Sequence, residues 1–264
     1  DLGDKSFYSF VKEKKSKFSY YRKLIDPLIK IQKIKLKKKN KYKNKIYKFK
    51  KYSIKELHKE SDLFFDWYLR FTTKNKNLKK IKYLVKKELN SIYKKIKFEN
   101  NIFTHRDFHA SNVMIKDKKF YVIDSQDAII GNPLYDLASL IDDIRLKISK
   151  KDQDKLFRYY IKKKKLKLKN QNFIRKDFDI LSVQRNLKIL GVFVRLSKRD
   201  NKHNYLKFLP YTWKMIQRRL KNPVFKNLNY ILRKNLQINK IDKINKLWKS
   251  NMQWYLLQAS VKEC

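Results

Sequence analysis

Three short apolar runs between residues 102 and 123 are separated by the charged loop HRDFHASN and by a turn rich in Lys and Asp. This pattern is typical of a strand, a polar loop and a β-hairpin. A tight hairpin brings its two ends together. We therefore expect Asn112 and Asp124 to lie side by side, with Asp107 on the loop that leads into the hairpin.

Apolar residues recur at helical spacing on both sides of this segment. The pattern predicts helices over residues 53–71, 78–98, 152–165, 173–198, 205–220 and 224–236. The pattern over residues 5–36 predicts two helices, or one helix broken near Pro27. Residues 35–51 are predicted to form a lysine-rich linker. Ser53 and Glu56 have the spacing of a capping box. We expect helices to make up most of the chain.

The polar residues around the hairpin suggest a particular chemistry. An Asp, an Asn and a second Asp that converge on one point form an oxygen-rich site. Such a site suits Mg²⁺ that carries the phosphates of a nucleotide, and it leaves one carboxylate over for another role.

Three stretches of the sequence resemble segments of a known protein family. HRDFHASN resembles the H-x-D-x-x-x-x-N catalytic loop of kinase-like phosphotransferases, and IDSQDA resembles their metal-binding Asp segment. GNPLYDLASLIDD is similar to the G-x-P-x-Y-D-L-A segment of aminoglycoside phosphotransferases and related sugar kinases. The resemblance implies the C-terminal, large lobe of a protein-kinase-like fold, which is α+β, mostly helical and has a small hairpin at its active site.

The same resemblance implies roles for individual residues and for cofactors. Asp107 would be the catalytic base that accepts the proton of the substrate hydroxyl. Asn112 and Asp124 would bind Mg²⁺, which accompanies ATP. Support of the loop would come from His105, Arg106 and Asp136.

Two further stretches resemble one branch of this family, the bacterial anomeric kinases for N-acetylmuramate and N-acetylglucosamine. They are ESDLFFDWYL and QRNLKILGVFVRL. The acceptor would then be the anomeric hydroxyl of an N-acetylated amino sugar, in cell-wall recycling. Residues implied in substrate binding are Trp67, Tyr68, Asp127 and Arg185. Trp67 and Tyr68 would stack on a sugar face, and Arg185 would pair with the carboxylate of N-acetylmuramate. Core packing and the tethering of a helix are the alternatives.

The first residues resemble the hinge between the two lobes of such kinases. The backbone of Asp1, Leu2 and Gly3 would contact the adenine. We therefore expect residues 1–4 to be a hinge remnant of an absent N-terminal lobe, residues 5–237 to be the C-terminal lobe, and residues 238–264 to be a tail without an assigned role. Three isolated glycines form no phosphate-covering G-x-G-x-x-G loop.

Composition changes this picture little. The formal charge of +45 would normally suggest a nucleic-acid partner. However, the lysines are scattered and accompany abundant Asn, Ile, Tyr and Phe, which AT-rich codons favour together, so we expect nucleic-acid binding to be unlikely. The one cysteine, Cys264, excludes an internal disulfide and fits a reducing cytoplasm. No apolar run approaches the ~20 residues of a membrane span, and the sequence does not indicate an oligomeric state.

Other functions stay open at this point. One is an aminoglycoside- or choline-type kinase of small alcohols, because relatives with the same catalytic loop use such substrates. A second is a non-catalytic remnant that binds polyanions. A third is a metal hydrolase built on His105, Asp107 and His109, whose side chains would point the same way on a strand.

Overall fold

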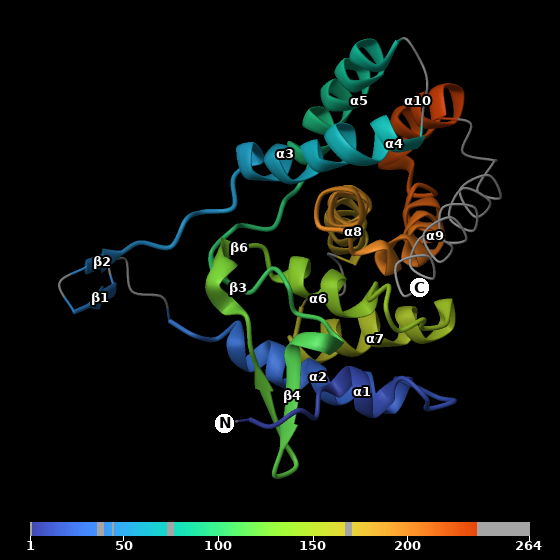
Figure 1. Ribbon diagram of the computed structural model, residues 1–264. Coiled ribbons are helices and arrows are strands. Elements are labelled where there is room, and N and C mark those ends of the chain that lie inside the picture. Colours follow the sequence, from blue (N-terminus) through green and yellow to red (C-terminus); the bar gives the residue numbers. More distant parts are fainter. Residues whose placement is uncertain (1, 36–39, 44, 73–76, 167–170, 237–264) are drawn as a thin grey trace, which may run out of the picture. The chain divides into compact units, whose positions relative to one another are not determined.

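The computed structural model of the protein describes residues 2–35, 40–43, 45–72, 77–166 and 171–236 (Figure 1). The chain divides into two compact units. The first consists of Asp1–Lys55 and Ile96–Ser182, and the second of Glu56–Lys95 and Val183–Cys264.

The helices of the first unit include α1 (Phe7–Val11), α2 (Phe18–Ile31), α6 (Pro133–Ile141), α7 (Lys150–Lys163) and the first part of α8 (Gln171–Arg199). α2 packs against α6 and α7 (Figure 1). The side chains of Ser149 and Asn132 accept hydrogen bonds from backbone N–H groups in the first turns of α7 and α6. These caps satisfy donors that a helix start otherwise leaves unpaired.

Residues 5–36 form two helices, which confirms the first of the two alternatives predicted for them, and the alternative of one helix broken near Pro27 is wrong. Pro27 lies inside α2, and the interruption between the first two helices falls at residues 12–17. A proline removes one hydrogen bond from a helix interior. Tertiary packing supplies most of the stability of a helix in a protein, and here the residues on both sides of Pro27 are buried, namely Leu24, Ile25, Leu28 and Ile29.

Short antiparallel pairs of strands complete the first unit. β3 (Ile102–Thr104) pairs with β6 (Ile129–Gly131), and β4 (Val113–Lys116) pairs with β5 (Lys119–Val122). The hairpin predicted after the polar loop is therefore present. The linker predicted over residues 35–51 is only partly correct, since it contains a hairpin of β1 (Asn40–Tyr42) and β2 (Lys45–Tyr47). Lys43 adopts a left-handed conformation with φ 51° in its turn.

The second unit is helical in the part of the chain that the structure describes. α3 (Ile54–Leu63), which begins in the first unit, continues into a π-helical segment, η1 (Phe64–Leu69), and then into α4 (Arg70–Thr72). The other helices of this unit are α5 (Leu78–Tyr93), α9 (Leu209–Arg219), α10 (Lys226–Leu236) and the second half of α8 (Gln171–Arg199). α5 packs against α10 (Figure 1).

Gly191 of α8 lies in close contact with the backbone at the end of α3. A Cβ atom at this position would lie 2.2 Å from the carbonyl carbon and oxygen of Leu63. Real Cβ atoms do not approach other atoms so closely, so the contact requires glycine. The start of η1 is therefore fixed against α8.

Most predicted helices are present with shifted ends. The helix predicted over residues 78–98 ends at Tyr93, and beyond it the N–H groups of Lys97 and Phe98 each donate to Oδ2 of Asp177 at 2.8 Å. The helix predicted over 205–220 starts with a 3-10 segment, His203–Phe208. Among the described residues, no helix is both long and apolar enough to cross a membrane. The predicted tail lies outside the described residues.

Candidate active site

The polar loop between β3 and β4 is anchored by the buried carboxylate of Asp136. Asp136 accepts hydrogen bonds from the backbone N–H of His105 at 2.7 Å and of Arg106 at 2.9 Å. Its place in the first turn of α6 also favours a negative charge. Arg106 adopts a left-handed backbone conformation, with φ 74°. The carboxylate therefore holds the turn that presents Asp107.

A second buried carboxylate anchors the other end of this loop. Oδ2 of Asp143 accepts from the N–H of Ala110 at 3.0 Å and from the Tyr21 hydroxyl at 3.4 Å, while its Oδ1 accepts from the N–H of Arg145 at 3.0 Å. Asp143 was not among the residues predicted to support the loop. Its place at the end of the GNPLYDLASLIDD segment was the available indication.

The hairpin brings Asn112 and Asp124 to its open end. The N–H of Ile123 donates to the backbone carbonyl of Asn112 at 3.0 Å, and the side-chain amide of Asn112 donates to the carbonyl of Asp107 at 3.1 Å. Asp124 follows Ile123 directly in a left-handed conformation, with φ 62°. Strained backbone of this kind is concentrated at functional sites. Asp107, Asn112 and Asp124 are thus linked to one end of the hairpin.

His105 braces the loop against the hairpin as an uncharged imidazole. Its side chain is 1% exposed, and Nε2 lies 2.9 Å from the backbone oxygen of Ile123. Burial lowers the pKa of His105, although this hydrogen bond and the charges of Asp107 and Asp124 partly oppose the shift. Because a carbonyl oxygen only accepts, Nε2 carries the proton of the neutral ring. His105 therefore supports the loop through a hydrogen bond to the hairpin and not through an ion pair.

Arg106 lies on the outer side of the loop. Its Nη1 donates to the backbone carbonyl of Asp127 at 3.2 Å, and its guanidinium lies 5.9 Å from the centre of the Tyr52 ring. Asp127 itself is exposed, in a 3-10 turn, Ser125–Asp127. Arg106 therefore connects the loop to the segment that follows the hairpin.

The donors at the open end of the hairpin fit Mg²⁺. Asp124 is exposed and makes no hydrogen bond or ion pair with the described part of the chain. Asn112 uses its amide nitrogen for the loop, so its amide oxygen is available to a ligand. A carboxylate and an amide oxygen make a small donor set, and Mg²⁺ commonly keeps several waters and binds substrate phosphates as well.

The geometry of the loop does not support the metal-hydrolase alternative. Within the described ranges, no three or more His, Cys, Asp or Glu side chains are grouped to hold a metal ion. β3 ends at Thr104, so His105, Asp107 and His109 lie on a loop and do not alternate along a strand.

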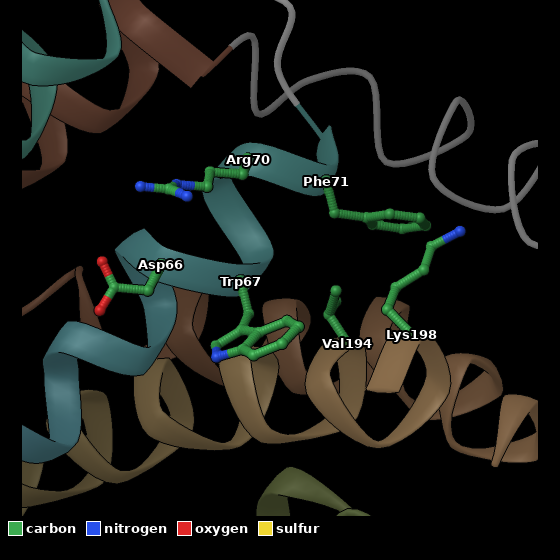
Figure 2. A pocket seen from close by; sticks show the side chains of 6 residues that line it. All are labelled: Asp66, Trp67, Arg70, Phe71, Val194 and Lys198. Atoms are coloured by element: carbon green, nitrogen blue, oxygen red, sulfur yellow. The ribbon is translucent and has the colours of Figure 1, made fainter. Parts of the chain in front are cut away.

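The residues predicted to bind substrate lie in different surroundings. Trp67 is partly buried and lines a cavity (Figure 2). Tyr68 is 3% exposed, and its ring stacks on those of Phe64 and Trp213 at 5.3 and 6.0 Å, which is the packing alternative. Arg185 is also 3% exposed, and its Nη1 finds no hydrogen-bond partner among the described residues.

The predicted roles of Arg185 and of the hinge residues stay predictions. The neighbours of Arg185 on the same helix, Gln184 and Lys188, both donate to Glu60, at 2.7 and 3.0 Å. For the predicted hinge, Asp1 lies outside the described residues, and Gly3 has a left-handed backbone with φ 68°.

Comparison with known proteins supports a kinase-like assignment. The model of the phosphotransferase enzyme family matches residues 55–168, which include the polar loop and the hairpin. The N-acetylmuramate/N-acetylglucosamine kinase of Caulobacter vibrioides is 26% identical over 223 residues, covering 81% of this chain and 59% of that protein. The kinase of the same name from Pseudomonas aeruginosa is 28% identical over 170 residues, covering 61% and 49%. The chain therefore spans about half to three-fifths of these relatives.

A solved structure supports the fold. The choline/ethanolamine kinase family protein of Mesorhizobium loti matches with a TM-score of 0.55 and 14% identity, covering 82% of this chain and 68% of that one. The helices and the hairpin of this chain are thus those of a protein-kinase-like fold. The chain is therefore an α+β, mostly helical protein with a protein-kinase-like fold, and it is similar to the phosphotransferase enzyme family over residues 55–168 and to the N-acetylmuramate/N-acetylglucosamine kinases.

Proposed function

We propose that the protein transfers the γ-phosphate of ATP to a hydroxyl of a small molecule, and that this hydroxyl is the anomeric one of N-acetylmuramate or N-acetylglucosamine. The observation that carries the proposal is the anchored loop. Asp136 fixes the backbone just before Asp107, and Asn112 holds the carbonyl of Asp107 itself. The sequence relatives support the choice of sugar.

Asp107 has the properties of the base in this reaction. Its side chain is only partly buried and has no hydrogen-bond partner within the described ranges, so a substrate hydroxyl can reach it. Neutral His105 next to it does not form a competing ion pair. Phosphoryl transfer requires mainly that the reacting groups are held in line. Asp107 would orient the sugar hydroxyl and accept its proton.

Asn112 and Asp124 would hold Mg²⁺ through the amide oxygen and the carboxylate. Neutralisation of the charge that develops on the transferred phosphate is the chemistry that bound Mg²⁺ supplies. The backbone of the hairpin keeps the two ligands at one end, which is the contribution of this chain.

The proposal is tested with the protein expressed from its complete coding sequence. ADP release is measured with N-acetylmuramate, N-acetylglucosamine, choline and an aminoglycoside at equal concentrations. We expect release with the two amino sugars and a phosphate on the anomeric oxygen, identified by ³¹P NMR. The methyl glycoside of N-acetylglucosamine is the matched control, because its anomeric oxygen is blocked.

The panel also separates the alternatives. Release with choline or the aminoglycoside alone would favour a kinase of small alcohols. Release with none of the four compounds, from a folded protein, would favour a remnant that binds polyanions without catalysis.

A further inference from the structure

A cavity of about 650 Å³ lies within the second unit (Figure 2). One side is formed by Asp66, Trp67, Arg70 and Phe71, from η1 and α4, and the other by Val194 and Lys198 of α8. Its volume falls in the range of sites for small molecules, about 300 to 1,000 Å³.

The π-helical segment places Trp67 at the wall of this cavity. The neighbouring rings of Phe64 and Tyr68 stack with Trp213 in the core. The indole of Trp67 makes no ring contact within the part of the chain that the structure describes, and it points from η1 toward α8 (Figure 2). π-helical turns occur frequently at functional sites, and a broad aromatic surface at a cavity wall suits a sugar ring.

The cavity carries an excess of positive charge. Its acidic residue, Asp66, is bound by Lys82 at 2.8 Å. Lys198 is exposed, its Nζ lies 5.2 Å from the centre of the Phe71 ring, and it reaches toward that ring, whereas Arg70 points away (Figure 2). Neither cation forms an ion pair with a described residue. A cation held over an aromatic ring remains available to an anion.

We propose that this cavity binds an acidic amino sugar, with the sugar ring against Trp67 and the acidic group on Lys198. The class of ligand rests on the proposed function. The assignment places recognition of the acid at Lys198 and not at Arg185. The reason is access, since Arg185 is 3% exposed whereas Lys198 is exposed.

Titration calorimetry without ATP tests the site, because no turnover can then occur. The ligands are N-acetylmuramate and N-acetylglucosamine, which differ by the acidic lactyl group. We expect N-acetylmuramate to bind about tenfold more tightly, since a charge-assisted contact contributes at least that factor. Lys198→Gln should abolish the difference, and Trp67→Leu should weaken both ligands by about tenfold.

N-acetylglucosamine 6-phosphate tests whether a phosphate can replace the carboxylate. If N-acetylglucosamine 6-phosphate binds wild type but not Lys198→Gln, the result would support a site that accepts a carboxylate or a phosphate. If its binding is unchanged in Lys198→Gln, the result would contradict the role of Lys198.

Two controls make the result specific. Lys80→Gln removes one exposed charge from α5 without touching the cavity, and it should keep the preference for N-acetylmuramate. Arg185→Gln should keep it as well. Loss of the preference in either control but not in Lys198→Gln would overturn the assignment, as would equal affinities for the two sugars.

The test separates this site from the proposed function. A protein that binds as expected but releases no ADP would contradict the kinase activity alone. This site alone would be contradicted if the protein is an active kinase but its affinity for both sugars is unchanged in Trp67→Leu and in Lys198→Gln. Circular dichroism would have to show that both variants are folded.

Discussion

At the scale of single residues, two buried carboxylates determine the shape of the polar loop. Asp136 and Asp143 each accept two backbone N–H groups, and both are 1% exposed. A carboxylate forms stronger hydrogen bonds to backbone N–H groups than a neutral acceptor does. The loop that carries Asp107 is therefore held in place before any ligand binds.

Removal of the first anchor should destabilise the protein. In Asp136→Ala, the N–H groups of His105 and Arg106 lose their acceptor, and we expect the free energy of unfolding to fall by about 3 kcal/mol. Urea denaturation measures the change. Glu13→Ala is the control, because the Glu13 side chain is 84% exposed and its loss should cost within about 0.5 kcal/mol. Equal effects of the two substitutions would contradict the anchoring role.

The burial of His105 predicts a pH dependence of stability. Its pKa is lowered in the folded protein, so between that pKa and the ordinary value of about 6.5 the unfolded chain binds more protons. The contribution of His105 to the free energy of unfolding is therefore complete above pH ~6.5 and decreases as the pH falls below it.

The matched variant for this prediction is His105→Gln, which can still donate to Ile123. Comparison of the two proteins also cancels Asp177, whose pKa is raised by burial and which acts in the opposite sense. Urea titrations at several pH values should show that wild type loses more stability than the variant on acidification. Parallel pH profiles would exclude the burial effect of His105.

At the scale of elements, the contact between α8 and the end of α3 fixes where η1 begins. Gly191 allows the two backbones to touch at Leu63. A glycine in a helix interior normally costs about 1 kcal/mol relative to alanine, so its presence here reflects close packing. The orientation of Trp67, which follows in η1, depends on this contact.

Gly191→Ala should therefore destabilise the protein despite the better helix propensity of alanine. The new Cβ would lie 2.2 Å from backbone atoms of Leu63, which cannot rotate away as a side chain could. We expect a loss of about 3 kcal/mol in thermal or urea unfolding. Lys87→Ala, on the exposed face of α5, is the control and should be close to neutral. A stabilising effect of Gly191→Ala would show that the two helices are not in contact.

The elements that the sequence predicted well are those with a local cause. Alternating apolar runs around a Lys-Asp turn predicted the β4–β5 hairpin, and helical spacing predicted α8 almost to its ends. Elements that depend on partners distant in sequence were predicted less well. Burial of α2 overcomes the local effect of Pro27, and η1 begins where α3 contacts Gly191.

For the candidate site, too, the parts that are close in sequence were predicted better than the parts that are distant. The motif placed Asp107, Asn112 and Asp124 together because they are close in sequence. The carboxylates that anchor the loop, Asp136 and Asp143, lie some 30 residues further along the sequence than the loop N–H groups that donate to them. Only the resemblance pointed to Asp136. Spacing alone could not tell that Tyr68 is in the core while Trp67, the residue before it, lines a cavity.

At the scale of the whole molecule, 69 Lys and Arg residues against 24 Asp and Glu residues give a strongly basic protein. Exposed ion pairs such as that of Lys12 and Glu13 contribute little to stability. Any attraction of this charge to a polyanion would be unselective and would weaken with added salt. Such attraction would not require Asp107, whereas the proposed phosphoryl transfer would.

One substitution therefore tests the central claim most directly. Asp107→Asn keeps the size and the backbone contacts of the residue but removes the proton acceptor. In the protein expressed from its complete coding sequence, we expect amino-sugar-dependent ADP release to fall by at least about a hundredfold, with an unchanged urea midpoint. Sugar-dependent ADP release that persists at the wild-type rate in folded Asp107→Asn protein would contradict the account.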